Sequence, residues 1–339
     1  MGDPGGNTSV LPVISFKKVP RMHELVSVVI VTCGTKDYFL SCLDSVFRQT
    51  YPSLEVILID NSMTPAVAAR TFAAYPSVRI VSTGRNLYYC EALNRGISKS
   101  RGAYVLCLND DVRLEPSFLL EAMQGFNASS QIGVVTGKLL RPDGATIDSA
   151  GMSLTLWRTP QERGYGQLDR GQLDRPGAVF AVNCAAALFR RAMLEDVREG
   201  DDWFDPDFRI FFEDLDICWR GQRRGWGAYY TPRALAYHVR GGTVRQDSGE
   251  GRPLARKYLS DDINAILLRN RYLVLLKNEK AWRLLLCFLP LLGYELLAWA
   301  YVLIYRRQVI RLFWSERSCF LRAWGNRLSG QSGCRPDPG

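Results

Sequence analysis

The chain has 339 residues, of which 47% are hydrophobic, 23% charged and 11% aromatic. These fractions are those of an ordinary globular protein, so they exclude a disordered, collagen-like or coiled-coil chain. The length predicts about two domains, or one large domain with an appendage. Nine cysteines are scattered without a Cys-x-x-Cys pair, and their odd number indicates a reducing compartment rather than a disulfide framework.

The formal net charge is +9, and the C-terminal part of the chain carries all of this excess. Residues 251–339 hold 15 Lys and Arg against 6 Asp and Glu, whereas residues 1–250 hold 28 of each kind. A nucleic-acid enzyme would more usually spread basic residues over its working face, together with stacking aromatic side chains. The basic residues here flank an apolar stretch at 284–304, which predicts a segment that contacts a membrane.

The apolar stretch contains Pro290 and Glu295, so the sequence leaves open whether it spans the membrane or lies on it. The alternative is a buried helix pair of a soluble fold. Residues 1–24 are polar and rich in Gly and Pro, without the apolar core of a signal peptide, so we expect a flexible lead and a cytoplasmic body. The predicted location is therefore the cytoplasmic face of the cell membrane, either peripheral or single-span.

Strands and helices alternate in the first half of the chain. The run VSVVIVT at 26–32 is β-branched at every position except Ser27, which is typical of a parallel strand buried on both faces. The alternation predicts an α/β fold with an open, mostly parallel sheet flanked by helices. The predicted strands are 26–32, 54–60, 77–82, 103–110 and 132–140, and the predicted helices are 37–49, 65–75, 88–99 and one that starts at Pro116.

The second half is less regular. Residues 141–177 hold six glycines and three prolines, which predicts a long loop or flap. After it we expect a strand-like run, a short helix ended by Gly225 and a strand pair, at 178–189, 207–225, 227–231 and 234–239. The predicted division is a lead at 1–24, a body at 25–245 and a basic, apolar helical membrane-associated region at 246–339.

Polar residues follow two of the predicted parallel strands, where ligands of open α/β sheets bind. Asn109, Asp110 and Asp111 follow one strand, and Asp60 follows another. Adjacent carboxylates repel each other, and a divalent cation shared with a diphosphate relieves the repulsion. The alternatives are an acidic turn after the strand at 103–110 and a helix cap after the strand at 54–60.

Glu213 and Asp214 come directly after two aromatic residues and precede a predicted helix. A partly apolar setting poises a carboxylate as a general base. The alternative is that acidic residues at this point only stabilise the helix dipole.

His238 and Arg240 form a further polar pair near the end of the predicted body. His238 could ligate a metal or contact a phosphate, and Arg240 could neutralise a diphosphate. The alternative for His238 is a structural hydrogen bond. With two histidines in the chain, a zinc site built on histidines is nearly excluded.

No GxGxxG follows the first strand, and GxxxxGK[ST], GxSxG and HExxH do not occur, which disfavours nicotinamide redox, P-loop and esterase chemistry. From about Val26 to Thr243 the chain resembles the inverting family 2 glycosyltransferases of the GT-A fold, in their rhamnosyltransferase-like branch. The resemblance is carried by VSVVIVTCGTKDYFLSCLDSVFRQTYPSLEVILIDNS, RNLYYCEALNRGISKSRGAYVLCLNDDV, IDSAGMSL, NCAAALFRRAML and FFEDLDICWR. It implies a GT-A nucleotide-binding sheet, to which the helical membrane-associated region predicted at 246–339 is appended.

The resemblance implies where a nucleotide-sugar and a metal would bind. Thr32 and Asp60 would hold the base and ribose. The segment Asn109 to Asp111 occupies the place of the DXD motif, with Asp111 as the metal ligand and Asp110 as a nearby contact. Asn109 brings no charge to the first position of this motif, and Tyr88 stands where a glycine is common in the family.

The resemblance also implies the catalytic residues. Asp214 would be the base, Glu213 would contact the acceptor, and His238 would lie near the diphosphate or the metal. The predicted function is an inverting transfer, dependent on Mg²⁺ or Mn²⁺, that moves a sugar to a lipid-linked saccharide or polysaccharide acceptor in cell-envelope glycan synthesis. The expected donor is dTDP-L-rhamnose, with a UDP-hexose next, and no nucleic acid is expected as a partner.

Two other functions stay open at the level of sequence. A sugar-phosphate nucleotidyltransferase has a similar sheet, but it calls for a glycine-rich phosphate loop after the first strand, of which TCGTKD is a poor version. An inactive membrane-bound scaffold that binds nucleotide-sugars is also compatible with the substitutions at Asn109 and Tyr88.

Overall fold

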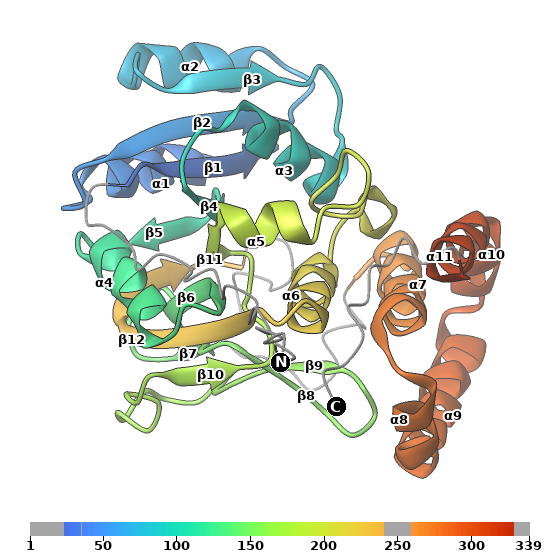
Figure 1. Cartoon of the computed structure of the whole chain (residues 1–339). Coiled ribbons are helices and arrows are strands. Elements are labelled where there is room, and N and C mark those ends of the chain that lie inside the picture. The colour runs from blue at the N-terminus through green and yellow to red at the C-terminus, as the bar shows by residue number, and fades with distance from the viewer. Residues whose placement is uncertain (1–23, 35, 241–258, 329–339) are drawn as a thin grey trace, which may run out of the picture.

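The computed structural model describes residues 24–34, 36–240 and 259–328. Nearly all of the predicted lead lies outside these residues, as do the junction at 241–258 and the end of the chain. A mixed ten-stranded sheet forms the centre of the molecule, and its main path runs in the order β10-β12-β6-β11-β4-β1-β2-β3 (Figure 1). The expected α/β fold with a nucleotide-binding type of sheet is therefore confirmed.

The strands are β1 (Val26–Thr32), β2 (Leu54–Asp60), β3 (Arg79–Ser82), β4 (Tyr104–Asn109), β5 (Val112–Leu114), β6 (Ile132–Leu140), β7 (Ile147–Ser149), β8 (Met152–Leu154), β9 (Pro160–Glu162), β10 (Gly177–Val179), β11 (Ala186–Arg190) and β12 (Gly227–His238). The helices are α1 (Tyr38–Phe47), α2 (Ala66–Ala74), α3 (Tyr88–Lys99), α4 (Phe118–Gly125), α5 (Arg191–Asp196), α6 (Glu213–Arg223), α7 (Asp261–Asn278), α8 (Ala281–Leu286), α9 (Phe288–Tyr305), α10 (Arg307–Ser315) and α11 (Ser318–Leu328).

The first four strands form the parallel half of the sheet, as predicted. All seven residues of β1 are buried because helices cover both faces of the sheet. Val28 and Ile30 point into one apolar core, whereas Val29 and Val31 point into the other. Because both faces of β1 are buried, its side chains on both faces are mainly apolar, and this explains the apolar run in the sequence.

The second half of the sheet departs from the prediction. The stretch 141–177 is not a plain loop, because it contains β7, which pairs with β6, and the separate hairpin β8–β9. The run at 178–189 contributes two short strands, β10 and β11, instead of one. The expected strand pair at 227–239 is the single long strand β12, whose pairing with β6 shifts register between Tyr230 and Leu235. A register shift locally disrupts pairing, which makes one strand look like two in sequence.

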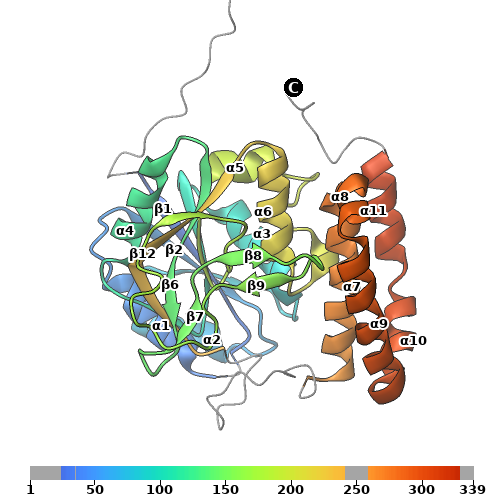
Figure 2. The same cartoon turned by 90° about the horizontal axis from the view of Figure 1, so that it is seen from below.

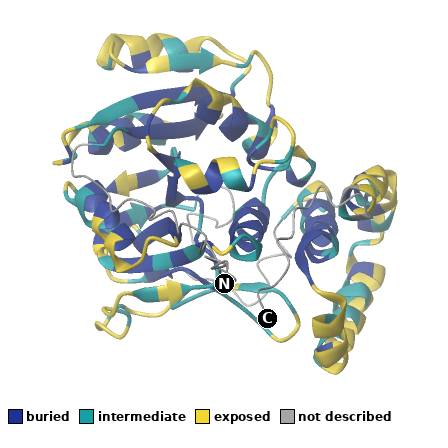
Figure 3. Ribbon diagram, in the orientation of Figure 1, coloured by how far each residue is buried: buried dark blue, intermediate teal, exposed yellow. Residues whose placement is uncertain are grey.

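The C-terminal helices lie on one side of the sheet. In Figures 1 and 2, α7 stands next to α6, and α8 to α11 form the outer layer. Figure 3 shows α7 mainly buried and the outer helices largely exposed. Of the helices within the described residues, α9 is long and apolar enough to cross a membrane by length and composition, and 6% of it is buried. The predicted apolar stretch is broken at Cys287, between α8 and α9.

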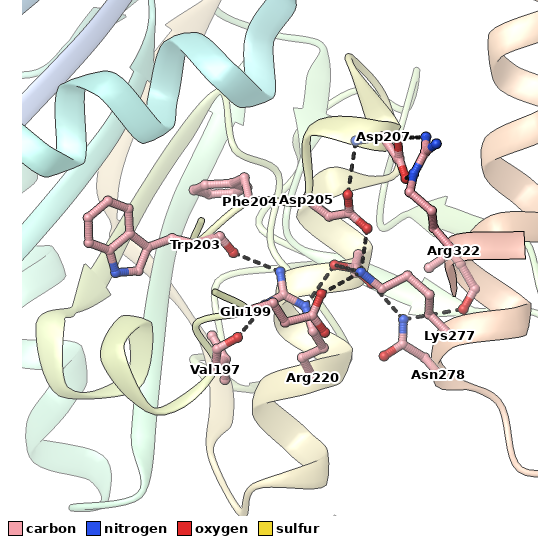
Figure 4. Close-up of polar contacts among 12 residues, drawn as sticks. Val197, Glu199, Trp203, Phe204, Asp205, Asp207, Arg220, Lys277, Asn278 and Arg322 are labelled. Carbon is pink, nitrogen blue, oxygen red and sulfur yellow. Dashed lines mark hydrogen bonds and ion pairs between the residues drawn. The ribbon is translucent and has the colours of Figure 1, made fainter. Parts of the chain in front are cut away.

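A buried charged cluster joins α7 to the body (Figure 4). The Lys277 ammonium lies 2.9 Å from Glu199 Oε2, 2.5 Å from Asp205 Oδ2 and 3.8 Å from Asp216 Oδ2. Burial opposes a charge on Asp205, yet the Lys277 ammonium holds the pKa of this carboxyl below its ordinary value. One cation of α7 therefore contacts three carboxylates of the body, of which Asp216 also pairs with Arg220.

Replacing Lys277 with Met should strongly destabilise the fold, since Glu199 and Asp205 lose their cation, whereas Asp216 keeps its ion pair with Arg220. We expect the free energy of unfolding to fall by about 3–5 kcal/mol at pH 7, measured by urea denaturation. The control is Arg48→Met, which removes an exposed ion pair with Asp44 and should cost less than about 1 kcal/mol. Equal losses in the two variants would contradict a structural role for the cluster.

Candidate functional site

Strands β1, β2 and β4 end at the same edge of the sheet. In the strand registers Thr32 pairs with Asp60, and Val31 pairs with Asn109. The polar residues that the sequence placed after these strands are therefore neighbours in space. This edge is the carboxyl end of the parallel strands, where ligands of open α/β sheets bind.

A cavity of about 490 Å³ opens beside this edge. Asn109 and Asp111 line it from the sheet, and Glu213 and Asp214 line it from the start of α6. The two acidic segments, far apart in sequence, thus face one cavity. The other lining residues are Tyr89, Met152, Pro160, Glu162, Asn183, Cys184, Ala185, Ile210, Phe211, Phe212, His238, Arg240, Ile263 and Leu267.

Three predicted binding residues lie at the same sheet edge but do not line this cavity. The Thr32 hydroxyl donates to Asp110 Oδ2 at 2.5 Å, and burial raises the pKa of Asp110 to about 6. Asp60 Oδ1 accepts from both the backbone N–H and the hydroxyl of Ser62. Asp60 therefore shapes the turn after β2, whatever else it contacts.

His238 and Asp111 form a pair in the cavity wall. His238 Nε2 lies 3.3 Å from Asp111 Oδ1, and His238 Nδ1 lies 2.9 Å from Asp148 Oδ2. Asp148 is completely buried and also accepts from Arg240 Nε. Burial opposes a charge on His238, but Asp111 and Asp148 together raise its pKa to about 9. Asp148 thus fixes the ring so that Nε2 faces Asp111.

A divalent cation would fit this pair in place of the proton that His238 Nε2 shares with Asp111, because a metal binds only the unprotonated ring nitrogen. No group of three or more His, Cys, Asp and Glu side chains is arranged to hold a metal within the part of the chain that the structure describes. The protein would therefore supply two ligands, Asp111 and His238, which suits Mg²⁺ or Mn²⁺ bound together with phosphate oxygens and water. The buried Asn109 Oδ1 has no hydrogen-bond partner among the described residues and lines the same cavity, so a bound ligand could satisfy it.

The two carboxyl groups at the start of α6 are held in low-dielectric surroundings. The Leu215 N–H donates to Asp214 Oδ1 at 2.8 Å. Burial, and then the nearby Glu162 carboxylate, raise the pKa of Asp214 to about 7. Burial and the neighbouring Asp214 raise the pKa of Glu213 well above its ordinary value. Asp214 is therefore poised to exchange a proton near neutral pH.

The sequence analysis missed Asp148 and Glu162. Glu162 accepts from the Ser149 hydroxyl and from Asn183 Nδ2, each at 2.5 Å, and lies 3.5 Å from Arg240 Nη2. Both acids belong to the glycine-rich stretch at 141–177, for which the sequence predicted a loop. Asp148 lies within IDSAGMSL, one of the segments that carry the family resemblance, and this is the one signal that could have pointed to it. Strand pairing of β7 with β6 and of β8 with β9 carries them into the site.

The segment before α6 has an unusual backbone. Arg209, Phe211 and Phe212 have φ angles of 60°, 68° and 69°, in the left-handed region that non-glycine residues rarely adopt. The completely buried Asn270 of α7 donates through Nδ2 to the carbonyl oxygens of Phe208, Ile210 and Phe211 at 2.8–2.9 Å. This side chain holds the segment that leads to Asp214.

Tyr88 lies against the same segment. Its φ of 57° explains why a glycine suits this position in the family. Its ring lies 5.4 Å from the Arg209 guanidinium, and the next two residues donate their backbone N–H groups to the Arg209 carbonyl. The substitution therefore adds a contact to the segment beside the cavity.

Replacing Asn270 with Asp should loosen the segment, because a carboxylate cannot donate to the three carbonyl groups. We expect a loss of at least about 2 kcal/mol in the free energy of unfolding and faster hydrogen exchange at the amides of Tyr89 and Cys90. Asn127→Asp, at an exposed position, is the control and should stay within about 0.5 kcal/mol of the parent. Unchanged exchange in the Asn270 variant would contradict its holding role.

Replacing Asp148 with Asn should weaken cation binding, since the His238 ring loses the charge that orients it. We expect the affinity for Mn²⁺ in the presence of pyrophosphate to fall about 10- to 100-fold, measured by electron paramagnetic resonance of the free ion. The exposed Asp143, which bonds only within its own turn, provides the control substitution Asp143→Asn. Equal affinity in both variants would refute a metal site at His238.

Comparisons with known proteins show the family and the fold of the chain. The family model for glycosyl transferase family 2 matches residues 27–198. Among curated relatives, the N-acetylglucosaminyl-diphospho-decaprenol L-rhamnosyltransferase of Mycobacterium tuberculosis is 28% identical over 251 residues, covering 67% of this chain and 80% of its own. The poly-beta-1,6-N-acetyl-D-glucosamine synthase of Staphylococcus epidermidis is 24% identical over 65% of this chain and 51% of its own.

A solved structure of the mannosyltransferase PcManGT from Pyrobaculum calidifontis, in complex with GDP-Man and Mn²⁺, superposes with a TM-score of 0.52. It is 17% identical and covers 91% of this chain and 79% of its own, so the likeness concerns the fold. The family model covers about half of the chain, from β1 to just past α5. The chain therefore belongs to glycosyl transferase family 2, as its sequence motifs predicted, and is a glycosyltransferase.

Proposed function

We propose that this chain transfers a sugar from a nucleotide-sugar to an acceptor hydroxyl with inversion at the anomeric carbon, with Mg²⁺ or Mn²⁺ at Asp111 and His238. One observation carries the proposal: the Asp111–His238 pair and Asp214 come from different elements and line the same cavity. Asp111 is on the sheet edge and Asp214 is on α6. This arrangement supports a cation site and a base that both face the space that a sugar would fill.

Asp214 is the proposed base. In its ionised form it would take the proton of the acceptor hydroxyl while that oxygen attacks the anomeric carbon from the side opposite the departing nucleotide. A single displacement inverts the configuration and needs no covalent enzyme intermediate. Glu213, which has an unpartnered Oε2 among the described residues, is proposed to contact the acceptor.

The donor is proposed to lie along the strand ends. Thr32, Asp60 and Asp110 would contact the nucleoside, and Asn109 a ribose hydroxyl. Arg240, which faces the cavity, would neutralise diphosphate charge. When bound, the metal would stabilise negative charge on the leaving nucleotide.

The donor and acceptor are proposed from the relatives. Similarity to a rhamnosyltransferase favours dTDP-L-rhamnose, with a UDP-hexose as the second choice. That relative is named for a decaprenol-linked acceptor, and the synthase for a polysaccharide, so the proposed acceptor is a lipid-linked saccharide or a growing polysaccharide of the cell envelope. The proposed location is the cytoplasmic face of the membrane, with the membrane surface as a partner.

A donor panel and one substitution test the proposal. Nucleotide-sugars are first screened for thermal stabilisation with and without Mn²⁺. With the best donor, Asp214→Asn should lower kcat for sugar transfer or donor hydrolysis by about 10²- to 10⁴-fold, while the exposed Asp201→Asn should leave it unchanged.

The other outcomes identify the rival functions. Binding of a nucleotide-sugar without turnover in the parent protein would favour the inactive scaffold. Release of pyrophosphate from a nucleoside triphosphate would favour a nucleotidyltransferase. Unchanged kcat in Asp214→Asn would reject Asp214 as the base.

The rate of transfer should rise with pH through about 7, because the base acts only when ionised and its pKa is raised to that value. Below that pH the rate should fall about tenfold per unit. Glu162→Gln removes a negative charge that raises the pKa of Asp214, so this acidic limb should move to lower pH. Glu91→Gln, at a more exposed position, is the control and should leave the limb in place. A limb that does not move would assign the titration to another group.

A further inference from the structure

Helix α9 has its polar and apolar faces reversed relative to an ordinary surface helix. Its one charged side chain, Glu295, and the indole of Trp299 point toward α7, and Val302 is buried. The exposed side chains of α9 carry no charge. The large ones are Phe288, Leu289, Leu292, Leu296, Leu297, Leu303, Ile304 and Tyr305. A helix in water normally turns its charged face outward, so this outer face is made for an apolar environment.

On helices α8 to α11 the acidic and basic side chains lie on different sides. From α8 to α11 the described chain holds two acidic residues, and both turn inward. Glu295 pairs with Arg271, and Glu316 pairs with Arg209 and Arg269. The exposed charged side chains of these helices are all basic: Arg283, Arg307, Arg311, Arg317 and Arg322. A surface that joins exposed leucines to exposed arginines complements an anionic lipid leaflet.

The middle of α9 is fastened to the catalytic body. Arg271 of α7 is completely buried and lies 2.7 Å from Glu295 Oε1. The same guanidinium donates to the Trp157 carbonyl and to the Thr159 hydroxyl in the turn of the β8–β9 hairpin. If α9 crossed a bilayer with this contact intact, the hairpin turn and the polar side chains of α7 would sit at the depth of its centre, at high cost.

We propose that α8 to α11 bind the surface of an anionic membrane, with α9 lying along the interface and not crossing it. The outer leucines of α9 enter the boundary between headgroups and acyl chains, and the arginines contact the lipid phosphates. Trp282, Trp314 and Trp324 are exposed on the same helices, as is typical of residues at a membrane interface. The inference rests on the proposed function in one respect, since it defines the membrane partner of that function.

Binding to vesicles tests the surface. The purified full chain is mixed with preformed vesicles of phosphatidylcholine, with or without phosphatidylglycerol, and separated by flotation. We expect binding that is stronger with the anionic lipid and weaker in high salt. The variant Leu296→Glu with Leu297→Glu should lose more than about tenfold in partition coefficient.

Two further variants make the test specific. Met63→Glu with Phe72→Glu changes exposed apolar residues near and on α2, on the far side of the molecule (Figure 1), and should bind as the parent does. Arg307→Gln with Arg311→Gln should weaken binding to anionic vesicles about fivefold per arginine at low salt. Binding that is unaffected by the leucine variant would overturn the proposal. So would a protein that ignores vesicles and instead forms a dimer that the leucine variant abolishes.

Labelling of a single cysteine decides between lying and crossing. Gln308→Cys, just after α9, is placed in a chain in which Cys33 and Cys334 are replaced by Ser, and the remaining seven cysteines are buried. In intact spheroplasts we expect no reaction with a membrane-impermeant maleimide, and full reaction after lysis. Labelling of intact spheroplasts would show that α9 crosses the membrane and would overturn the inference.

Activity in solution separates this inference from the proposed function. Hydrolysis of a water-soluble donor should be the same in the leucine variant and in the parent. If both bind no donor but the parent still binds vesicles, the proposed function fails and the membrane inference stands. If donor hydrolysis is normal and vesicles are not bound, the membrane inference fails and the proposed function stands.

Discussion

The hydrogen bonds from Asn270 to the carbonyl oxygens of Phe208, Ile210 and Phe211 hold the segment on which the candidate site depends. That segment has left-handed φ angles at Arg209, Phe211 and Phe212, a backbone that persists only where surrounding structure holds it. Asp214 follows two residues later. The position of the proposed base is therefore set by Asn270, a side chain of the C-terminal helix α7, and not by the parallel part of the sheet.

The two residues next to Asn270 on α7 also hold other segments in place. Arg269 donates to the carbonyl groups of Asp207 and Phe208, and Arg271 connects the β8–β9 hairpin with α9. The hairpin ends at Glu162, whose charge raises the pKa of Asp214. One buried helix thus links the proposed base, the carboxylate that raises its pKa and the helices that we propose to face a membrane.

The two sides of the cavity are built on different principles. On the proposed metal side, at the ends of the sheet strands, the buried Asp148 carboxylate is paired with both His238 and Arg240, and its pKa is lowered. On the side of the proposed base, burial raises the pKa of both Glu213 and Asp214. The ionised form is therefore stabilised at Asp148 and destabilised at the proposed base.

The sequence by itself determined the parallel half of the sheet, because strands buried on both faces need unbroken apolar runs such as 26–32, and the polar residues after them mark the ligand edge. Local pattern also gave the apolar C-terminal stretch and the acidic start of α6. The tertiary structure alone decided that Asp148 and Glu162 enter the site, that 227–238 is one strand, and that Glu295 turns inward. These features depend on strand pairing and on ion pairs between distant segments, and neither leaves a periodic signal in the chain.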